Sequence, residues 1–339
     1  MTRIAFIGAG SWGTALGSVA ARRNPVVMWA REAEVVEGIN SRHGNPLFLS
    51  AFVLPRSLTA TSSIGDAVRG AELVVVAVPS RFYRAVLHDA AGAIAPGAAV
   101  LSLTKGLEEE TLLRMSEVAR SELVGHLPSR IGVLSGPNIA REVVAGQPSA
   151  TVVAFPDAEL AEWVQALLLD DSFRVYTHTD VIGCEIAGAA KNVIALACGI
   201  ADGLGYGANT QAALVTRGLA ELTRLGIALG GDALTFLGLA GVGDLFATCT
   251  SPYSRNRSVG VELGRGRSLA EIIHGMTMVA EGVQTAAPVV ALAQSVGVDM
   301  PIAEQVVEVL GGASHGHSVE LLMGRPGRRE MAGLLASEP

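Results

Sequence analysis

The stretch IAFIGAGSWGTALG, residues 4–17, decides the fold of the N-terminal half. It opens with a short apolar run typical of a buried strand and passes through closely spaced glycines into a helical pattern. Gly8 permits a tight turn, Gly10 lets the backbone approach a pyrophosphate, and Gly13 lets the helix pack on the strand. The alternative is a plain glycine turn. The order of strand, glycines and helix favours a dinucleotide site in a Rossmann-like domain, with the helix N-terminus facing the phosphates.

The two halves of the chain differ in their periodicity. Up to about residue 178, β-branched runs alternate with amphipathic stretches, which is typical of βαβ units around a mostly parallel sheet. The expected strands are 3–7, 26–29, 73–78, 98–103, 131–134, 151–155 and 174–176. Alanine- and leucine-rich helical stretches then follow, as at 181–201 and 212–229. We therefore predict a Rossmann-like NAD(P)-binding domain over residues 1–180 and an all-α substrate-binding domain over 181–339.

The composition excludes several classes of protein. The 339 residues carry a net charge of −7, which argues against nucleic-acid binding. Cys184, Cys198 and Cys249 have neither CxxC nor zinc spacing, so we expect reduced thiols, no metal site and a cytoplasmic location. The N-terminus lacks the pattern of a signal peptide, and each apolar run looks too short or too interrupted by glycine to span a bilayer. We therefore expect no membrane insertion.

The end of the second strand bears on the choice of cofactor. A carboxylate at this point would bind the ribose hydroxyls of NAD, but the chain has Ala30-Arg31. A guanidinium can pair with a 2′-phosphate, so we predict a preference for NADPH that does not exclude NADH. Glu32 could still reach the ribose, and Arg31 could instead be a solvated residue at a helix start.

Only two of the 25 basic residues are lysines, Lys105 and Lys191. An ammonium can lose its proton in a buried site, whereas a guanidinium cannot, so both lysines are candidate catalytic groups. A composition bias that leaves two lysines by chance is the alternative.

Lys105 directly follows an expected strand, at the carboxyl edge of the sheet where such folds bind ligands. The next strand ends in Ser135-Gly136-Pro137-Asn138-Ile139-Ala140. There Gly136 offers backbone groups, and Asn138 offers an amide to a substrate or to the nicotinamide carboxamide. A helix-capping role for Asn138 is compatible with this function.

Lys191 lies on an expected helix among small residues, with Ala187, Gly188 and Ala195 one turn away. Burial there, with Lys105 nearby, would lower its pKa from about 10.4 toward the range of about 7 to 8 that suits a general acid or base. A lysine that extends along the surface to solvent is the alternative.

Further motifs follow in the helical half. Asp244 could accept a hydrogen bond from a substrate hydroxyl or orient Lys191. Taken alone, it could equally be an ordinary aspartate in a turn. Ser254-Arg255-Asn256 opens an expected helix and could hold a phosphate, or could simply be an N-cap with an exposed arginine. Glu281, at an expected helix start, is a further candidate for cofactor contact.

Together these motifs identify a resemblance that runs over essentially the whole chain. The chain resembles the bacterial-type NAD(P)-dependent glycerol-3-phosphate dehydrogenases. The motifs that carry the resemblance are GAGSWGTA (8–15), TKGL (104–107), SGPNIA (135–140), GAAKNV (188–193), GVGDLFATCT (241–250) and SRN (254–256). It implies a Rossmann-like domain followed by a helical domain like the C-terminal domain of 6-phosphogluconate dehydrogenase.

The resemblance also implies roles for single residues. Those implied to contact the cofactor are Gly8, Gly10, Ser11, Trp12, Gly13, Arg31, Lys105, Ala140, Arg255, Val279 and Glu281. Those implied to contact substrate are Lys105, Gly136, Asn138, Lys191, Asp244, Ser254, Arg255 and Asn256. Lys191 would be the proton donor and acceptor, assisted by Lys105 and Asp244. The sequence departs from the family at Asn138, where serine is usual, and at Ala190, where a branched aliphatic residue is usual.

We therefore expect an NADPH-dependent reduction of dihydroxyacetone phosphate to sn-glycerol 3-phosphate, which serves glycerophospholipid synthesis. A homodimer is expected from the alanine-rich helices and the resemblance. One rival is a related dehydrogenase of β-hydroxy acids, which would not need the Ser254–Asn256 triplet. Another is a nucleotide-sensing protein without turnover, which would need neither lysine.

Overall fold

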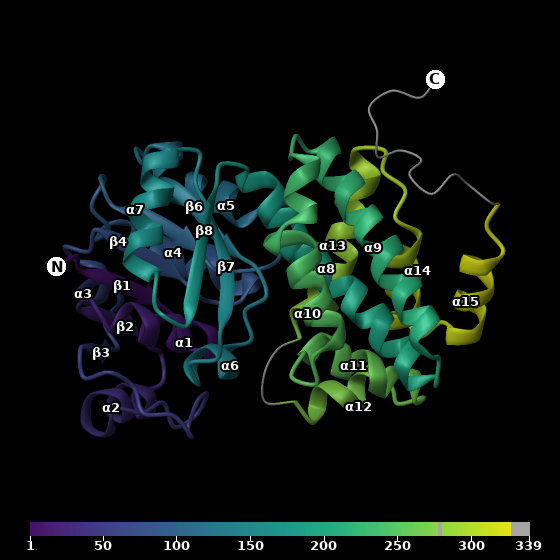
Figure 1. Cartoon of the computed structure of the whole chain (residues 1–339), viewed down its shortest axis with the longest axis horizontal. Coiled ribbons are helices and arrows are strands. Elements are labelled where there is room, and N and C mark those ends of the chain that lie inside the picture. Colours follow the sequence, from purple (N-terminus) through teal and green to yellow (C-terminus); the bar gives the residue numbers. More distant parts are fainter. Residues whose placement is uncertain (277–279, 327–339) are drawn as a thin grey trace. The chain divides into compact units, whose positions relative to one another are not determined.

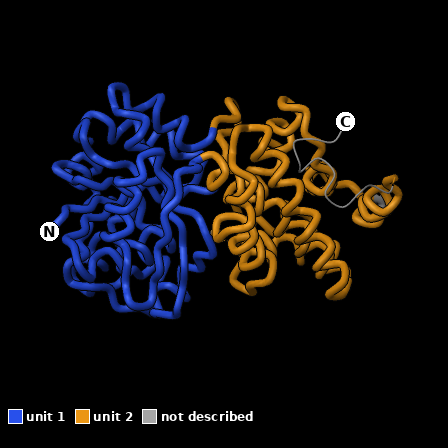
Figure 2. The backbone as a smooth tube through the Cα atoms, turned by 45° about the horizontal axis from the view of Figure 1, so that its top comes forward, with its two compact units in different colours: residues 1–105, 114–181 blue, residues 106–113, 182–339 orange. Residues whose placement is uncertain are grey.

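The structure, a computed structural model, describes residues 1–276 and 280–326 (Figure 1). The chain divides into two compact units, coloured blue and orange in Figure 2. The N-terminal unit comprises residues 1–105 and 114–181, and the helical unit comprises residues 106–113 and the described residues from 182 onward. Residues 106–113 thus belong to the helical unit although they follow a strand of the N-terminal unit, which the sequence pattern does not indicate.

One eight-stranded sheet forms the frame of the N-terminal unit, in the order β3-β2-β1-β4-β5-β6-β7-β8. The strands are β1 (Ile4–Ile7), β2 (Val26–Trp29), β3 (Leu58–Thr61), β4 (Leu73–Val76), β5 (Ala99–Ser102), β6 (Ile131–Ser135), β7 (Ser149–Ala154) and β8 (Phe173–His178). Neighbouring strands are parallel except β6 and β7, which are antiparallel. The prediction of a mostly parallel, Rossmann-like sheet is confirmed.

Strand β3 is the one strand of this sheet that the sequence analysis missed. Its four residues, Leu-Thr-Ala-Thr, contain a single large apolar side chain, that of Leu58. The strand lies at an edge of the sheet, where it pairs with β2. An edge strand needs less apolar surface than a central one, so its sequence carries a weaker signal.

Helices connect the strands of this unit. They are α1 (Ser11–Ala20), α2 (Ala33–Arg42), α3 (Ile64–Val68), α4 (Ser80–Ala91), α5 (Met115–Glu122), the 3-10 helix η1 (Pro128–Arg130), α6 (Ala140–Val144) and α7 (Ala158–Leu168). Some begin at residues with capping side chains: Ser63 accepts from the N–H of Asp66 at the start of α3, and Asp157 accepts from that of Leu160 at the start of α7.

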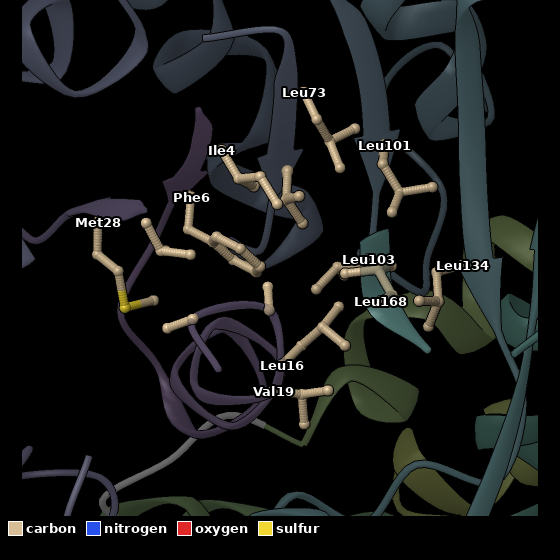
Figure 3. Close-up of a cluster of buried hydrophobic side chains, with 14 of the residues drawn as sticks. Ile4, Phe6, Leu16, Val19, Met28, Leu73, Leu101, Leu103, Leu134 and Leu168 are labelled. Carbon is tan, nitrogen blue, oxygen red and sulfur yellow. The ribbon is translucent and has the colours of Figure 1, made fainter. Parts of the chain in front are cut away.

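The core of the N-terminal unit lies between α1 and the sheet. Ile4 and Phe6 are two positions apart on β1 and point to the same side, towards Leu16 and Val19 of α1 (Figure 3). All residues of β1 are buried, as expected of a central parallel strand covered on both faces. This packing fixes the start of α1 against the end of β1.

The helical unit is built around one long central helix. Its elements are α8 (Val181–Gly203), α9 (Ala208–Ala228), the 3-10 helix η2 (Ala233–Leu237), the π-helical turn η3 (Leu239–Gly243), α10 (Asp244–Thr250), α11 (Arg255–Gly264), α12 (Leu269–His274), α13 (Glu281–Ser295), α14 (Pro301–Leu310) and α15 (His315–Met323). The expected helical second half is confirmed.

Helix α8 corrects one expectation from the sequence. By length and composition it could cross a membrane, contrary to the expectation that every apolar run is too short or too interrupted by glycine. However, 89% of its apolar stretch is buried within the protein. Its apolar character is therefore that of a core helix, which is hydrophobic on all sides because other helices surround it.

Helices α8 and α11 approach each other through glycines. A Cβ added to Gly199 would lie 2.2 Å from the carbonyl oxygen of Arg257 and 2.9 Å from the Cα of Gly260. One turn further on, a Cβ on Gly203 would lie 3.0 Å from the Cα of Gly264. Real Cβ atoms do not approach this closely, so the two helix backbones are in direct contact. The contact fixes the separation between the helix that carries one candidate lysine and the helix that opens with the candidate phosphate triplet.

Candidate active site

The turn between β1 and α1 has the geometry that its glycines predict. Gly8 has φ of +109°, which disfavours residues with a Cβ, and a Cβ there would lie 2.6 Å from the carbonyl oxygen of Ala77. A Cβ on Gly13 would lie 2.3 Å from the carbonyl oxygen of Gly8. The turn is therefore closed on the protein side by backbone packing.

The ligand side of the same turn is open. A Cβ on Gly10 would have no described atom within 4 Å. Gly10 is also the N-cap of α1, so it has no side chain to engage the N–H groups of the first helical turn. Ser11 and Trp12 form that turn, and the Ser11 hydroxyl donates to the backbone carbonyl of Phe48 at 3.3 Å. A helix start of this kind suits an anion such as a pyrophosphate.

Arg31 follows β2 and forms an ion pair with the adjacent Glu32. Its Nη2 lies 2.8 Å from the Glu32 carboxylate, and its side chain is 75% exposed. An exposed pair is weak and can exchange one anion for another at little cost. Arg31 is thus placed where it could turn to a phosphate, but Glu32 competes for it.

Lys105 and Gly136 come together at the ends of β5 and β6. The Lys105 ammonium donates to the carbonyl oxygen of Gly136 at 3.0 Å. Gly136 has φ of +134°, and a Cβ there would lie 3.1 Å from the Cα of Thr151. Only a glycine therefore presents this carbonyl to the lysine without strain, and the contact holds the ammonium at the sheet edge.

Asn138 is fixed by a short chain of hydrogen bonds. Its amide nitrogen donates to the Thr151 hydroxyl at 3.0 Å, and that hydroxyl donates to the carbonyl oxygen of Ser135 at 2.8 Å. Because Thr151 uses its only proton on Ser135, it must accept from Asn138, which fixes the orientation of the amide. The Asn138 amide oxygen then has no hydrogen-bond partner in the described chain.

Several buried polar atoms in the N-terminal unit lack partners among the described residues. Three of them belong to candidate turns, namely Nε1 of Trp12, Oγ of Ser135 and Oδ1 of Asn138. Buried polar groups are normally hydrogen-bonded, and these three lie at or after the carboxyl ends of strands β1 and β6, where this fold binds ligands. They fit a polar ligand such as a nicotinamide dinucleotide. Ala140 begins α6, next to the same turn.

Lys191 is buried in the helical unit and has two side-chain partners. It forms an ion pair with Asp244 and donates to the hydroxyl of Thr248 at 2.7 Å. The side chains of Lys191 and Asp244 are 7% and 2% exposed. The expected apolar environment of Lys191 therefore also contains a carboxylate in contact with the ammonium.

Local structure places the two partners of Lys191. The π-helical turn η3 ends at Gly243 and runs without a break into α10, whose first residue is Asp244. Thr248 lies four residues later on the same face, and its hydroxyl donates to the Asp244 carbonyl at 2.6 Å. One helical turn thus presents both an acceptor charge and an acceptor hydroxyl to the ammonium.

Asn256 connects three helices beside Lys191. Its amide nitrogen donates to Oδ1 of Asn192 at 2.8 Å, and its amide oxygen accepts from the N–H of Gly282 at 2.9 Å. Both asparagines are at most 8% exposed. The bonds hold α11 and the start of α13 against α8, and they place Glu281, the first residue of α13, next to this network.

The rest of the predicted triplet lies at the start of α11. The Ser254 hydroxyl caps the helix by accepting from the N–H of Arg257 at 3.3 Å. Arg255 is exposed in the first turn. Both the capping role and the anion-binding arrangement considered from the sequence are thus compatible with this geometry. Val279, also expected to contact the cofactor, lies outside the described residues.

The candidate residues form two groups, one in each unit. Lys105, Gly136 and Asn138 lie in the N-terminal unit with the glycine turn, and Lys191, Asp244 and the 254–256 triplet lie in the helical unit. Sequence reasoning gave no role to the polar partners of these residues, namely Thr151, Asn192 and Thr248. For Thr248, its spacing of four residues from Asp244 was an available signal.

Comparison with known proteins shows a resemblance over nearly the whole chain. A family profile described as the NAD-dependent glycerol-3-phosphate dehydrogenase N-terminus matches residues 3–161, and its C-terminal counterpart matches residues 180–319. A Sphingopyxis alaskensis protein named glycerol-3-phosphate dehydrogenase [NAD(P)+] 2 is 52% identical, over 91% of this chain and 92% of its own. A Corynebacterium urealyticum protein named glycerol-3-phosphate dehydrogenase [NAD(P)+] is 49% identical over 97% of this chain and its own full length.

The fold agrees with a solved structure of the same kind. The crystal structure of glycerol-3-phosphate dehydrogenase from Coxiella burnetii superposes with a TM-score of 0.91 at 36% sequence identity. The match covers 96% of this chain and 99% of the other.

Proposed function

The chain belongs to the NAD-dependent glycerol-3-phosphate dehydrogenase family, and from this membership we propose that it catalyses the reversible, NAD(P)H-dependent reduction of dihydroxyacetone phosphate to sn-glycerol 3-phosphate. The observation that carries the proposal is the buried Lys191, held by Asp244 and Thr248 in the unit that also carries the Ser254–Asn256 triplet. The product serves glycerophospholipid synthesis.

The residues of the N-terminal unit would hold the cofactor, which when bound supplies the hydride. Gly8, Gly10 and Gly13 shape the turn, and the N–H groups of Ser11 and Trp12 would face the pyrophosphate. Residues 1–180 would thus act as the cofactor-binding domain. The proposed set of cofactor contacts also includes Lys105, Ala140, Arg255, Val279 and Glu281.

Arg31 supports a preference for NADPH over NADH. Its exposed guanidinium could exchange Glu32 for a 2′-phosphate, which carries more charge than a single carboxylate. The test is the ratio of kcat/KM for the two cofactors. Arg31→Ala should lower kcat/KM for NADPH and leave that for NADH nearly unchanged; an equal effect on both would contradict this assignment.

The helical unit would bind and protonate the substrate, so residues 181–339 would act as the catalytic domain. Ser254, Arg255 and Asn256 would hold the phosphate through a hydroxyl, a guanidinium and an amide at the start of α11. Binding energy from this remote group would position the ketone carbon. In the N-terminal unit, Gly136 and Asn138 would contact oxygens of the substrate. The amide oxygen of Asn138, which has no partner among the described residues, could accept a hydrogen bond from a substrate hydroxyl.

Lys191 would donate the proton from Nζ to the developing alkoxide and take it back in the reverse direction. Asp244 would orient the ammonium before the reaction, and Lys105 would add a second positive charge near the oxygen. Lys191→Arg keeps the charge but cannot release a proton at neutral pH. It should therefore lower kcat by about 10²- to 10⁴-fold, and normal turnover would remove Lys191 from this role.

The decisive assay follows NADPH and NADH oxidation with dihydroxyacetone phosphate, with dihydroxyacetone and a β-keto acid as controls. Activity that requires the phosphate would support the proposal. Activity on the β-keto acid alone would favour the rival dehydrogenase class, and cofactor binding without turnover would favour the nucleotide-sensing class.

We further infer a cytoplasmic location and a homodimer. The three cysteines are free thiols, which agrees with a reducing compartment. Sedimentation equilibrium of the purified chain measures its mass in solution, and a monomer at the concentrations of the assay would contradict the dimer.

A further inference from the structure

The helical unit contains a large cavity that includes none of the residues proposed for catalysis. Its volume is about 1170 Å³, and it lies among α8, α9, α14 and α15. Small-molecule sites in proteins are typically concave, mostly apolar and about 300–1,000 Å³ in volume. This cavity is slightly larger than that range, so it has room for a ligand, and it includes no residue of the proposed active site.

The wall of the cavity is mainly aliphatic. Leucine, isoleucine, valine and alanine side chains from all four helices line it, including Ile200 of α8, Leu214 of α9, Val306 of α14 and Leu322 of α15. Tyr206 is the single aromatic residue among the described residues of the wall. A flat aromatic ligand would find almost no stacking partner there, whereas an alkyl chain would meet aliphatic side chains along its length.

One polar group in the wall is unsatisfied. The Ser318 side chain of α15 lines the cavity and is buried, at 6% exposure. Its hydroxyl has no hydrogen-bond partner among the described residues. Buried hydroxyls normally have partners, so this atom points to a ligand with a polar group.

Charges in the wall favour an anion. Arg217 and Arg224 lie two turns apart on one face of α9, with Glu221 between them. Glu221 accepts from the N–H groups of Ile302 and Ala303 at the start of α14, at 2.8 and 3.3 Å. These donors already engage the carboxylate from the side of α14, and burial raises the pKa of Glu221 to about 7. The described wall carries three arginines, Arg217, Arg224 and Arg325, against two carboxylates, Glu221 and Asp299, and Asp299 is paired to Arg325.

We propose that this cavity is a second binding site, for a medium- or long-chain aliphatic carboxylic acid. The alkyl chain would lie against the aliphatic walls of the four helices. The carboxylate would meet the arginines of α9 and accept a hydrogen bond from Ser318. The site is independent of the proposed reaction, because it uses no residue assigned to cofactor or substrate.

Two alanines of α9 provide a matched pair of variants for the test. Ala213 lines the cavity and Ala212 does not, and both are exposed, so a tryptophan at either position should be tolerated by the fold. The measurement is calorimetric titration of the full chain with sodium dodecanoate, and with sodium butanoate as the short-chain control. Thermal unfolding of each variant checks that it is folded.

We expect dodecanoate to bind with a stoichiometry near one per chain and butanoate to bind far more weakly. Ala213→Trp should weaken dodecanoate binding by about tenfold or more, and Ala212→Trp should leave it unchanged. Arg217→Gln should also weaken it. Neither tryptophan should alter turnover of dihydroxyacetone phosphate, so the cavity and the proposed reaction are tested separately.

Several outcomes would overturn the proposal. One is that dodecanoate does not bind to the unmodified chain. Another is that Ala213→Trp and Ala212→Trp weaken dodecanoate binding equally. A third outcome is a dimer in sedimentation experiments that Ala213→Trp dissociates. In that case a second copy of the chain, and not a fatty acid, would cover this cavity.

Discussion

The N-terminal unit builds its candidate site from backbone, whereas the helical unit builds its own from side chains. In the first, Gly8, Gly10 and Gly13 let main-chain groups lie where side chains would otherwise stand. In the second, a buried ammonium is held by a carboxylate and a hydroxyl from another helix. This difference shows that the first site depends on glycines, which have no Cβ atom. The second site depends on a partner for each buried charge. The two sites should therefore fail in different ways when altered.

The largest expected effect is on the buried ion pair. Lys191→Met would leave Asp244 buried and without its cation, at a cost of about 3–5 kcal/mol in the free energy of unfolding. The double variant Lys191→Met/Asp244→Leu should recover most of this loss, because no charge then remains buried. Urea denaturation measures both.

An exposed ion pair serves as the control for that cycle. Arg265→Met breaks the pair with Glu262 on α11, where the arginine side chain is 63% exposed, and should cost at most about 1 kcal/mol. If Lys191→Met cost no more than Arg265→Met, the pairing of buried charge would not be what holds the helical site.

Glu221 is a buried carboxylate held by backbone N–H groups, so it tests whether such donors can stabilise a buried charge as a cation does. Burial, the largest cause, raises its pKa in the folded chain to about 7 from 4.5, against the opposing effect of its hydrogen bonds to Ile302 and Ala303. The folded state then binds more protons than the unfolded state between these values, so stability should fall as the pH rises from about 4.5 to 7. The loss should be about 3 kcal/mol.

The pH dependence is measured as the difference between the unmodified chain and Glu221→Gln, because other groups titrate in the same range. Arg224 and Asp299 face Glu221 and have opposite effects on its pKa. The difference in unfolding free energy should change between pH 5 and pH 8. A constant difference would mean that the two N–H donors suffice to keep the carboxylate ionised.

The glycine turn should respond to the addition of a single methyl group. Gly13→Ala places a Cβ against the carbonyl oxygen of Gly8 and should destabilise the chain by about 1–3 kcal/mol. Gly10→Ala meets no described atom, so it should cost less than about 1 kcal/mol but weaken cofactor binding. Thermal unfolding and cofactor titration separate the two effects. Equal destabilisation by both would show that the open side of the turn is not reserved for a ligand.

A small effect is expected for Thr248. Thr248→Val keeps the shape of the side chain but removes the acceptor for Lys191 and the donor to the Asp244 carbonyl. The loss should be about 1 kcal/mol, with Thr248→Ser as the variant that restores the hydroxyl. Identical denaturation midpoints for valine and serine would assign the stabilisation to the ion pair alone.

The same contrast explains what the sequence could predict. The glycine turn and the central strands are encoded in adjacent residues, so both were predicted close to their observed positions. The pairing of Lys191 with Asp244 joins residues 53 positions apart, and only one of the two partners of Lys191 was named. Thr248 and Asn192 were missed because a polar residue on a helix has no local signal for what it will face.

Other misses have tertiary causes. Strand β3 forms because β2 offers a free edge, not because its own sequence is strongly apolar. Helix α8 has the composition of a membrane-spanning segment, and only the surrounding helices make it a core helix. Residues 106–113 join the helical unit through packing, including that of the buried Leu107, which no periodicity reveals.

The glycine contact between α8 and α11 also limits how this chain can change over evolutionary time. In most helix pairs, an enlarged side chain on one helix can be matched by a smaller one on the other. Here Gly199 and Gly203 face Gly260 and Gly264, so the partner positions already hold the smallest residue. A compensating substitution does not exist, and the spacing of the two helices can be kept or lost but not adjusted. Lineages that retain this helix pair should therefore retain all four glycines together.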